Sequence, residues 1–147
     1  ALALNEFEIF KVMDEKTLSA LASCMTQQHI PANTCIFQAN SPGEELMLIA
    51  SGQIKITLSI SKNTIVHLAT LGRGQFFGEM SFLDGRAPSA YVQASQETEI
   101  FAIDRNAFAK LAAGAPLMSL GVMRSLALVL ADRLRQTNVE LREVRET

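Results

Sequence analysis

The sequence predicts a mainly β domain with flanking helices, in which an antiparallel sandwich or barrel forms the centre. Short apolar runs, separated by glycine, proline and polar pairs, fill the middle of the 147-residue chain. Apolar residues at helical spacing lie before this zone and after it. The chain is 48% hydrophobic and 19% charged, which suits one folded domain spanning residues 1–147.

Residues 1–26 predict helices. Asp14 is placed to cap a helix, because its carboxylate can accept free N–H groups of the first turn. The residues after it carry apolar side chains at spacings of three and four, namely Leu18, Leu21, Ala22 and Met25. Phe7 and Phe10 precede Asp14 and predict a short helical turn that packs on the rest of the domain.

Residues 27–104 predict strands. In residues 53–60, isoleucine and leucine alternate with polar residues without a break, which is typical of a half-buried strand. Further strands are expected at 46–50, 64–71, 90–95 and 99–103. Turns are expected where glycine, proline or polar pairs interrupt the pattern, at 41–43, 51–52, 72–74 and 96–97.

Residues 105–147 predict helices again. Asp104 or Asn106 can cap a short helix that ends near Ala113, and Pro116 suits the first turn of a long one. A seam recurs along the long helix every three and four positions: Leu120, Met123, Ala127, Leu130, Leu134, Thr137, Leu141 and Val144. So narrow a heptad seam predicts a homodimer through residues 117–144. The alternative is a single amphipathic helix that lies on its own domain.

Before Ala131 other faces of the long helix are apolar too, at Leu126, Leu128 and Val129. After it the residues off the seam include many polar ones: Asp132, Arg133, Arg135, Gln136, Glu140, Arg142 and Glu143. The first half is therefore expected to pack on the strands as well. The second half is expected to project and meet a partner helix.

The stretch 76–91, FFGEMSFLDGRAPSAY, predicts a ligand cradle. Gly78 permits a bend and a close approach by a ligand. Residues 79–84 suffice for about one to one and a half helical turns, whose first N–H groups can bind an anion. Glu79 is an acceptor for ribose-type hydroxyls, and Ser89 offers a hydroxyl and an N–H. A sugar phosphate fits these groups, whereas the alternative is an ordinary connection between strands.

Other function classes find little support in the composition. A net charge of −2 argues against a broad basic surface, so no nucleic-acid partner is expected within this chain. No apolar run approaches the roughly 20 residues of a membrane helix. No GxSxG, HExxH or P-loop motif occurs, so no catalytic residue is expected and the chain is not expected to be an enzyme.

The cysteines and histidines do not predict a metal site. Cys24 and Cys35 do not form a CxxC motif, and His29 and His67 are isolated from them and from each other. Two reduced, partly buried thiols and a cytoplasmic location are expected. The chain begins at Ala1 rather than Met, so we expect it to be part of a longer protein.

The segment FFGEMSFLDGRAPSAYVQA resembles the phosphate-binding cassette of the cyclic nucleotide-binding domain family. That family typically shows F-G-E-[ML]-[AS]-x-[LI] and then P-R-[ST]-A. Residues 46–54 are similar to its strand hairpin, and residues 71–78 to the loop before the cassette. The resemblance implies an antiparallel β-roll (a jelly roll, or double-stranded β-helix), as in catabolite activators and protein kinase A regulatory subunits. It implies cyclic AMP or cyclic GMP as ligand, bound by Phe77, Gly78, Glu79, Met80, Ser81, Arg86, Pro88, Ser89 and Ala90.

One position departs from the family pattern. Members that bind cyclic AMP carry an arginine immediately before the [ST]-A pair, and Pro88 stands there in this chain. Proline has neither charge nor N–H, so it cannot replace a bidentate guanidinium. Three interpretations follow. Arg86 reaches the phosphate through a shifted loop, the pocket binds another ligand or a cyclic nucleotide weakly, or the pocket is empty.

The resemblance implies a sensor module of a larger protein that signals through its C-terminal helices. Phe108, Leu111 and the helix from Pro116 are the expected moving parts, and Arg133 and Arg135 are candidate lid residues. One alternative is a ligand-free dimerisation or docking domain. Another is the sensor half of a transcription regulator whose DNA-binding part is absent.

Overall fold

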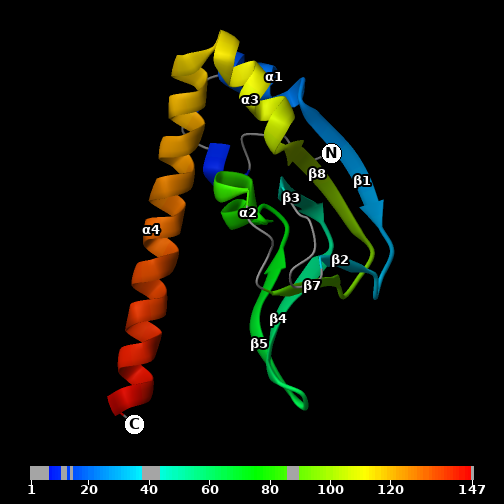
Figure 1. Cartoon of the computed structure of the whole chain (residues 1–147), viewed down its shortest axis with the longest axis vertical. Helices are drawn as coiled ribbons and strands as arrows, with labels where there is room; N and C mark the ends of the chain where they lie inside the picture. The colour runs from blue at the N-terminus through cyan, green and yellow to red at the C-terminus, as the bar shows by residue number, and fades with distance from the viewer. Residues whose placement is uncertain (1–6, 11–12, 14, 38–43, 86–89, 147) are drawn as a thin grey trace.

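Two antiparallel sheets form the centre of the molecule, and helices cover one side of it (Figure 1). The structure, a computed structural model, describes residues 7–10, 13, 15–37, 44–85 and 90–146. Within these ranges the first sheet has the order β1 (Met25–Ile30), β8 (Thr98–Asp104), β3 (Glu45–Ser51) and β6 (Phe76–Phe77). The second has the order β2 (Cys35–Phe37), β7 (Tyr91–Ala94), β4 (Gln53–Ser61) and β5 (Thr64–Gly72). This confirms the predicted antiparallel β-roll.

Strand β3 is buried on both faces, which explains its unbroken apolar sequence. Met47 and Ile49 face the second sheet and belong to the core between the sheets, together with Phe77 of β6. Leu46 and Leu48 face the other way and belong to a second core under the helices. A strand with one solvated face would instead alternate between apolar and polar residues, as residues 53–60 of β4 do.

The helices pack on the outer face of the first sheet. They are η2 (Glu8–Phe10), α1 (Glu15–Ala22), α2 (Glu79–Asp84), α3 (Arg105–Gly114) and α4 (Pro116–Glu146). Figure 1 shows α4 running along one side of the molecule, with α2 between it and the strands. The core under the helices includes side chains from both ends of the chain and from α2, namely Phe7, Phe10, Leu21, Phe82, Phe108, Met118, Val122, Leu126 and Val129.

Strands β1, β2 and β6 were not expected from the sequence. Met25, which the sequence pattern assigned to a helix, instead begins β1, because α1 ends at Ala22. The intervening turn is held by bonds from Ser23 N to the Ala20 carbonyl and from Cys24 N to the Leu21 carbonyl, at 3.3 and 3.0 Å. Asp104, and not Asn106, caps α3: its Oδ2 accepts from Ala107 N at 3.0 Å. The expected cap Asp14 and turn 41–43 lie outside the described residues.

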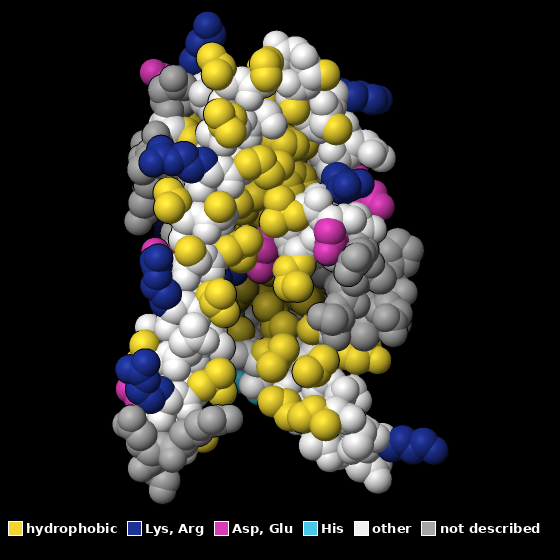
Figure 2. Space-filling model, turned by 60° about the vertical axis from the view of Figure 1, so that its left-hand side comes forward, with side chains coloured by type: hydrophobic (Ala, Val, Ile, Leu, Met, Phe, Trp, Pro, Cys, Tyr) yellow, Lys and Arg dark blue, Asp and Glu magenta, His cyan; other side chains and the backbone are white. Residues whose placement is uncertain are grey.

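Helix α4 has one buried face and one exposed face. Met118, Val122, Leu126 and Val129 are each at most 8% exposed. The seam leucines Leu120, Leu134 and Leu141 are 65%, 62% and 58% exposed. Figure 2, in which hydrophobic side chains are yellow, shows such side chains gathered on the face that α4 shares with the strands. Among the described helices, none is long and apolar enough to cross a membrane.

Candidate functional site

The cassette begins with a tight turn at Gly78. Gly78 has a left-handed backbone (φ 81°) and stands at the N-cap of α2, so the chain turns sharply out of β6 and Glu79 becomes the first helical residue. The Gly78 carbonyl accepts from Phe82 N at 3.1 Å. The short helix ends at Gly85, which is also left-handed (φ 72°) and donates its N–H to the Ser81 carbonyl at 2.8 Å.

The predicted site residues lie in different environments. Phe77 is 1% exposed and points into the core between the sheets. Within α2, Ser81 is buried, whereas Met80 is 67% exposed. Gly78, Glu79 and Ala90 are half-buried. The remaining three predicted residues, Arg86, Pro88 and Ser89, lie outside the described ranges.

The carboxylate of Glu79 is directed inward and meets Arg133 of α4. Arg133 Nη1 lies 3.5 Å from Glu79 Oε1, and the two side chains are 32% and 16% exposed. Arg133 Nη2 donates to the Phe76 carbonyl at 3.3 Å, and its Cζ lies 4.2 Å from the centroid of the Phe76 ring. A guanidinium suits this place because its fork serves several acceptors while its plane stacks on an aromatic ring.

Arg135, the other candidate lid residue, faces away from the cassette. Its Nη1 lies 3.3 Å from Asp132 Oδ1, and both side chains are 78% exposed. Residues two positions apart on a helix point to nearly opposite sides, so only one of the two arginines could face α2. The structure therefore brings together Glu79 and Arg133, which are 54 positions apart in the sequence.

The C-terminal end of α2 contacts α3. The ring of Phe82 packs on the ring of Phe108, with centroids 5.4 Å apart. Arg105 Nε donates to the Phe82 carbonyl at 3.1 Å. The family resemblance implied that Phe108 is a moving part, but it did not indicate Arg105, because no motif or spacing marks an arginine that bonds to a backbone carbonyl.

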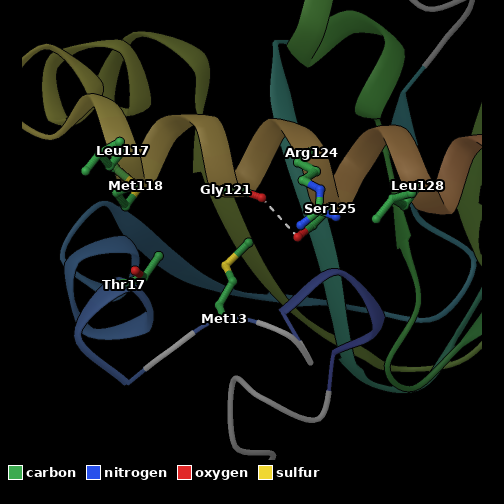
Figure 3. Close-up of a pocket in the computed structure, with 8 residues that line it drawn as sticks. All are labelled: Met13, Thr17, Leu117, Met118, Gly121, Arg124, Ser125 and Leu128. Atoms are coloured by element: carbon green, nitrogen blue, oxygen red, sulfur yellow. Dashed lines mark hydrogen bonds between the residues drawn. The ribbon is translucent and has the colours of Figure 1, made fainter.

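A cavity of about 200 Å³ lies elsewhere, beside the first turns of α4. Figure 3 shows it between Met13 and Thr17 on one side and the α4 residues on the other. Its α4 wall consists of Leu117, Met118, Gly121, Arg124, Ser125 and Leu128. The Ser125 hydroxyl in this wall donates to the Gly121 carbonyl at 3.0 Å. Glu79 and Arg133 do not line this cavity, so it is separate from the cassette.

The titratable groups outside the cassette do not form a metal site in the part of the chain that the structure describes. No group of three His, Cys, Asp or Glu side chains is placed there to hold a metal ion. Burial raises the pKa of the Cys24 thiol, whose Sγ donates to the Leu21 carbonyl at 3.2 Å. Cys24 is half-buried as expected, whereas Cys35 is exposed.

The amino-acid sequence is similar to those of known proteins. The profile of the family described as cyclic nucleotide-binding domain matches residues 27–114. The chain is 37% identical over 111 residues to the cyclic AMP receptor protein of Thermus thermophilus, covering 76% of this chain and 50% of that protein. It is 30% identical over 138 residues to glutaminase 2 of Bradyrhizobium diazoefficiens, covering 94% of this chain and 21% of that protein.

Solved structures show the same fold. The crystal structure of the Thermus thermophilus catabolite activator protein superposes with a TM-score of 0.80 at 31% sequence identity, covering 93% of this chain and 62% of that one. The chain thus spans half of the length of the receptor protein and about a fifth of the glutaminase.

Proposed function

The chain belongs to the cyclic nucleotide-binding domain family, and on that premise we propose that it is a regulatory module that senses cyclic AMP or cyclic GMP. The nucleotide binds at the cassette of residues 78–90. The signal passes through α3 and α4 to the remainder of a larger protein. The module's own role is regulatory and not catalytic.

One observation carries this proposal: the carboxylate of Glu79 faces inward, at the start of α2 and under α4, instead of facing bulk water. A half-buried carboxylate at the entrance of a short helix is suited to accept the hydroxyls of a ribose. Its present neighbour, Arg133, keeps two hydrogen bonds and so has further N–H groups to offer. An anionic group of a ligand at this place would meet that guanidinium.

Signalling requires that the ligand bind two arrangements of α4 unequally. Arg133 supplies the physical means, because it is fixed on α4 and contacts the cassette at Glu79 and at the Phe76 carbonyl. A ligand that bonds to Glu79 or to Arg133 changes the contact that holds α4 against α2. Cassette occupancy is thereby linked to the position of the long helix.

Titration calorimetry with cyclic AMP and cyclic GMP tests the proposal. We expect the wild-type chain to bind one of them. We expect Glu79→Gln to weaken that binding by about 10- to 100-fold, since a hydrogen bond to a charged acceptor is lost. Glu97→Gln, which removes an exposed carboxylate from the turn before β8, is the control and should not change the affinity. Absence of heat from wild type at millimolar ligand contradicts the proposal.

The same titration examines Arg86. If this residue takes the place of the arginine that the family pattern carries at position 88, Arg86→Ala should also lose affinity. If Arg86→Ala binds as wild type does, the cation that meets the phosphate is another residue.

A ligand-free pairing domain is the second candidate, and the contact between Arg133 and Glu79 favours it. That contact satisfies the carboxylate from within the chain, so the cassette does not need a ligand to be stable. The exposed seam of α4 offers the pairing surface, for a second copy of this chain. Thermal melts separate the candidates, because a ligand that binds only the folded state raises the melting temperature and a pairing domain shows no such rise.

A further inference from the structure

The C-terminal end of α2 is held by a residue from another helix. The last carbonyls of a helix have no partner within it, and at α2 the carbonyl of Phe82 is one of them. Arg105, the first residue of α3, donates to this carbonyl through Nε at 3.1 Å. The bond joins residues 23 positions apart, so it links two elements and is not a local cap.

The guanidinium of Arg105 also closes around Gly85. A Cβ atom added at Gly85 would lie 3.1 Å from Arg105 Nη1 and 3.2 Å from its Cζ. Gly85 is left-handed, so any other residue would be strained there as well. The end of α2 and the head group of Arg105 therefore lie so close together that a methyl group at Gly85 would push the guanidinium aside by a few tenths of an ångström.

Arg105 is itself held in place at the start of α3. Its N–H donates to the Glu44 carbonyl at 3.2 Å, and the residue before it, Asp104, caps the helix. Phe108, three residues further along α3, packs on the ring of Phe82. The end of α2 thus has a directional contact through Arg105 and an apolar contact through Phe108, and both belong to the first turn of α3.

We propose that Arg105 is a positioning residue that couples α2 to α3, so that a displacement of the cassette helix moves α3 and, beyond Ala115, α4. The apolar contact between the two rings can slide, because it has no fixed direction. The bond from Nε cannot slide without breaking, since its strength depends on the angle at the hydrogen. This inference rests on the proposed function, because it concerns how ligand at the cassette reaches α4.

Hydrogen exchange of the ligand-free chain tests the coupling by itself. In Arg105→Ala, amide exchange at the end of α2 and in the first turn of α3 should increase together, by about 10-fold, as expected when a hydrogen bond from a charged donor is lost. Arg105→Lys keeps the positive charge but not the guanidinium, and it is the second variant in case Arg105→Ala does not fold. Lys110→Ala removes an exposed cation from the same helix and should leave both segments unchanged. Unchanged exchange in α2 in both Arg105 variants overturns the inference.

The second arm adds cyclic AMP and measures affinity and exchange in α4 separately. We expect Arg105→Ala to keep its affinity for cyclic AMP within about 10-fold of wild type, because uncoupling removes only the share of the binding free energy that shifts α4. The ligand-dependent change of exchange in residues 116–144 should be lost. Loss of measurable binding would mean that Arg105 merely supports the fold of the cassette, and would also overturn the inference. If wild type binds no cyclic nucleotide, the proposed function fails, and the ligand-free arm still decides whether Arg105 couples the helices.

Discussion

At the scale of single residues, the contact of Arg133 with the cassette combines three weak attractions. The guanidinium reaches Glu79 at 3.5 Å and the Phe76 carbonyl at 3.3 Å, and it stacks on the Phe76 ring. None of the three distances is short. Their combined energy matters because all three partners of Arg133 are at least partly buried. Removing the guanidinium would leave all three without this contact.

Replacing Arg133 should therefore cost stability, whereas replacing Arg135 should not. We expect Arg133→Ala to lower the free energy of unfolding by about 1–2 kcal/mol, from the loss of a partly buried ion pair and a cation–π contact. Arg135→Ala removes an exposed pair and should change it by less than about 0.5 kcal/mol. Urea unfolding at one fixed protein concentration measures both. Equal losses in the two variants would contradict the assigned role of Arg133.

The sequence indicated Arg133 and Arg135 as candidate lid residues, but it did not show which of the two faces the cassette. The choice depends on which face of α4 is buried, and that is set by the fit of Val122, Leu126 and Val129 against the rest of the core. Side-chain periodicity alone shows two apolar faces on this helix and does not tell which of them packs on the strands. Arg105 had no signal in the sequence, because its acceptor is a backbone carbonyl.

At the scale of elements, the pairing of β1 with β8 carries the clearest charge interaction between strands. His29 and Glu99 are directly opposite each other in the register, and Nδ1 lies 2.6 Å from Oε1. The hydrogen bond to Glu99 raises the pKa of His29 above its ordinary 6.5. The same bond lowers the pKa of Glu99 below its ordinary 4.5.

This pair should stabilise the fold only in mildly acidic solution. The contribution of His29 is complete below about pH 6.5 and is lost as the pH rises through its folded-state pKa. The contribution of Glu99 is complete above about pH 4.5 and is lost as the pH falls through its folded-state pKa. We expect His29→Gln to lower the melting temperature at about pH 5.5 and to have little effect at about pH 8.5. His67→Gln is the control. A loss that is the same at both pH values would show that the charge of His29 contributes nothing.

The strands that the sequence predicted have a clear apolar pattern, whereas β1 and β6, which it missed, do not. The residues of β4 alternate between polar and apolar, and β3 is apolar from Leu46 to Ala50, so each carries a strand signal in its sequence. Strand β1, MTQQHI, is mostly polar and half-exposed, and it becomes a strand because β8 offers a free edge to pair with. Strand β6 has two residues, too few to form any period.

At the scale of the whole molecule, the two faces of α4 have different tasks. Its buried face joins the core of the domain, while the seam with Leu120, Leu134 and Leu141 is exposed. Val139, also on the second half of the helix, is 47% exposed but lies off the seam. The domain covers part of the seam, since Met123 packs against the core. An apolar stripe that is exposed at Leu120, Leu134 and Leu141 favours a second copy as its partner.

We expect the chain to be a dimer in solution and the double variant Leu134→Ala with Leu141→Ala to shift it towards the monomer. Removing two exposed leucines should weaken the dimer by more than about 30-fold, if they lie at the centre of the interface. Sedimentation equilibrium over a range of concentrations measures this. Val139→Ala, the matched control, should leave the dimer intact. A wild-type chain that stays monomeric throughout, or a loss as large with Val139→Ala, would contradict a pairing through the seam.

The contact between Glu79 and Arg133 also has a consequence for the order in which this protein is made. Synthesis proceeds from the N-terminus at roughly 5–20 residues per second, so Arg133 leaves the ribosome about 3–10 s after Glu79. During that interval the strands and the short helix can already assemble, but the acid at the cassette lacks its basic partner and the phenylalanines beneath α4 lack their cover. The nascent domain therefore passes through a stage in which the corner around Glu79 is open to water, and this corner closes only after residues 116–133 of α4 have emerged.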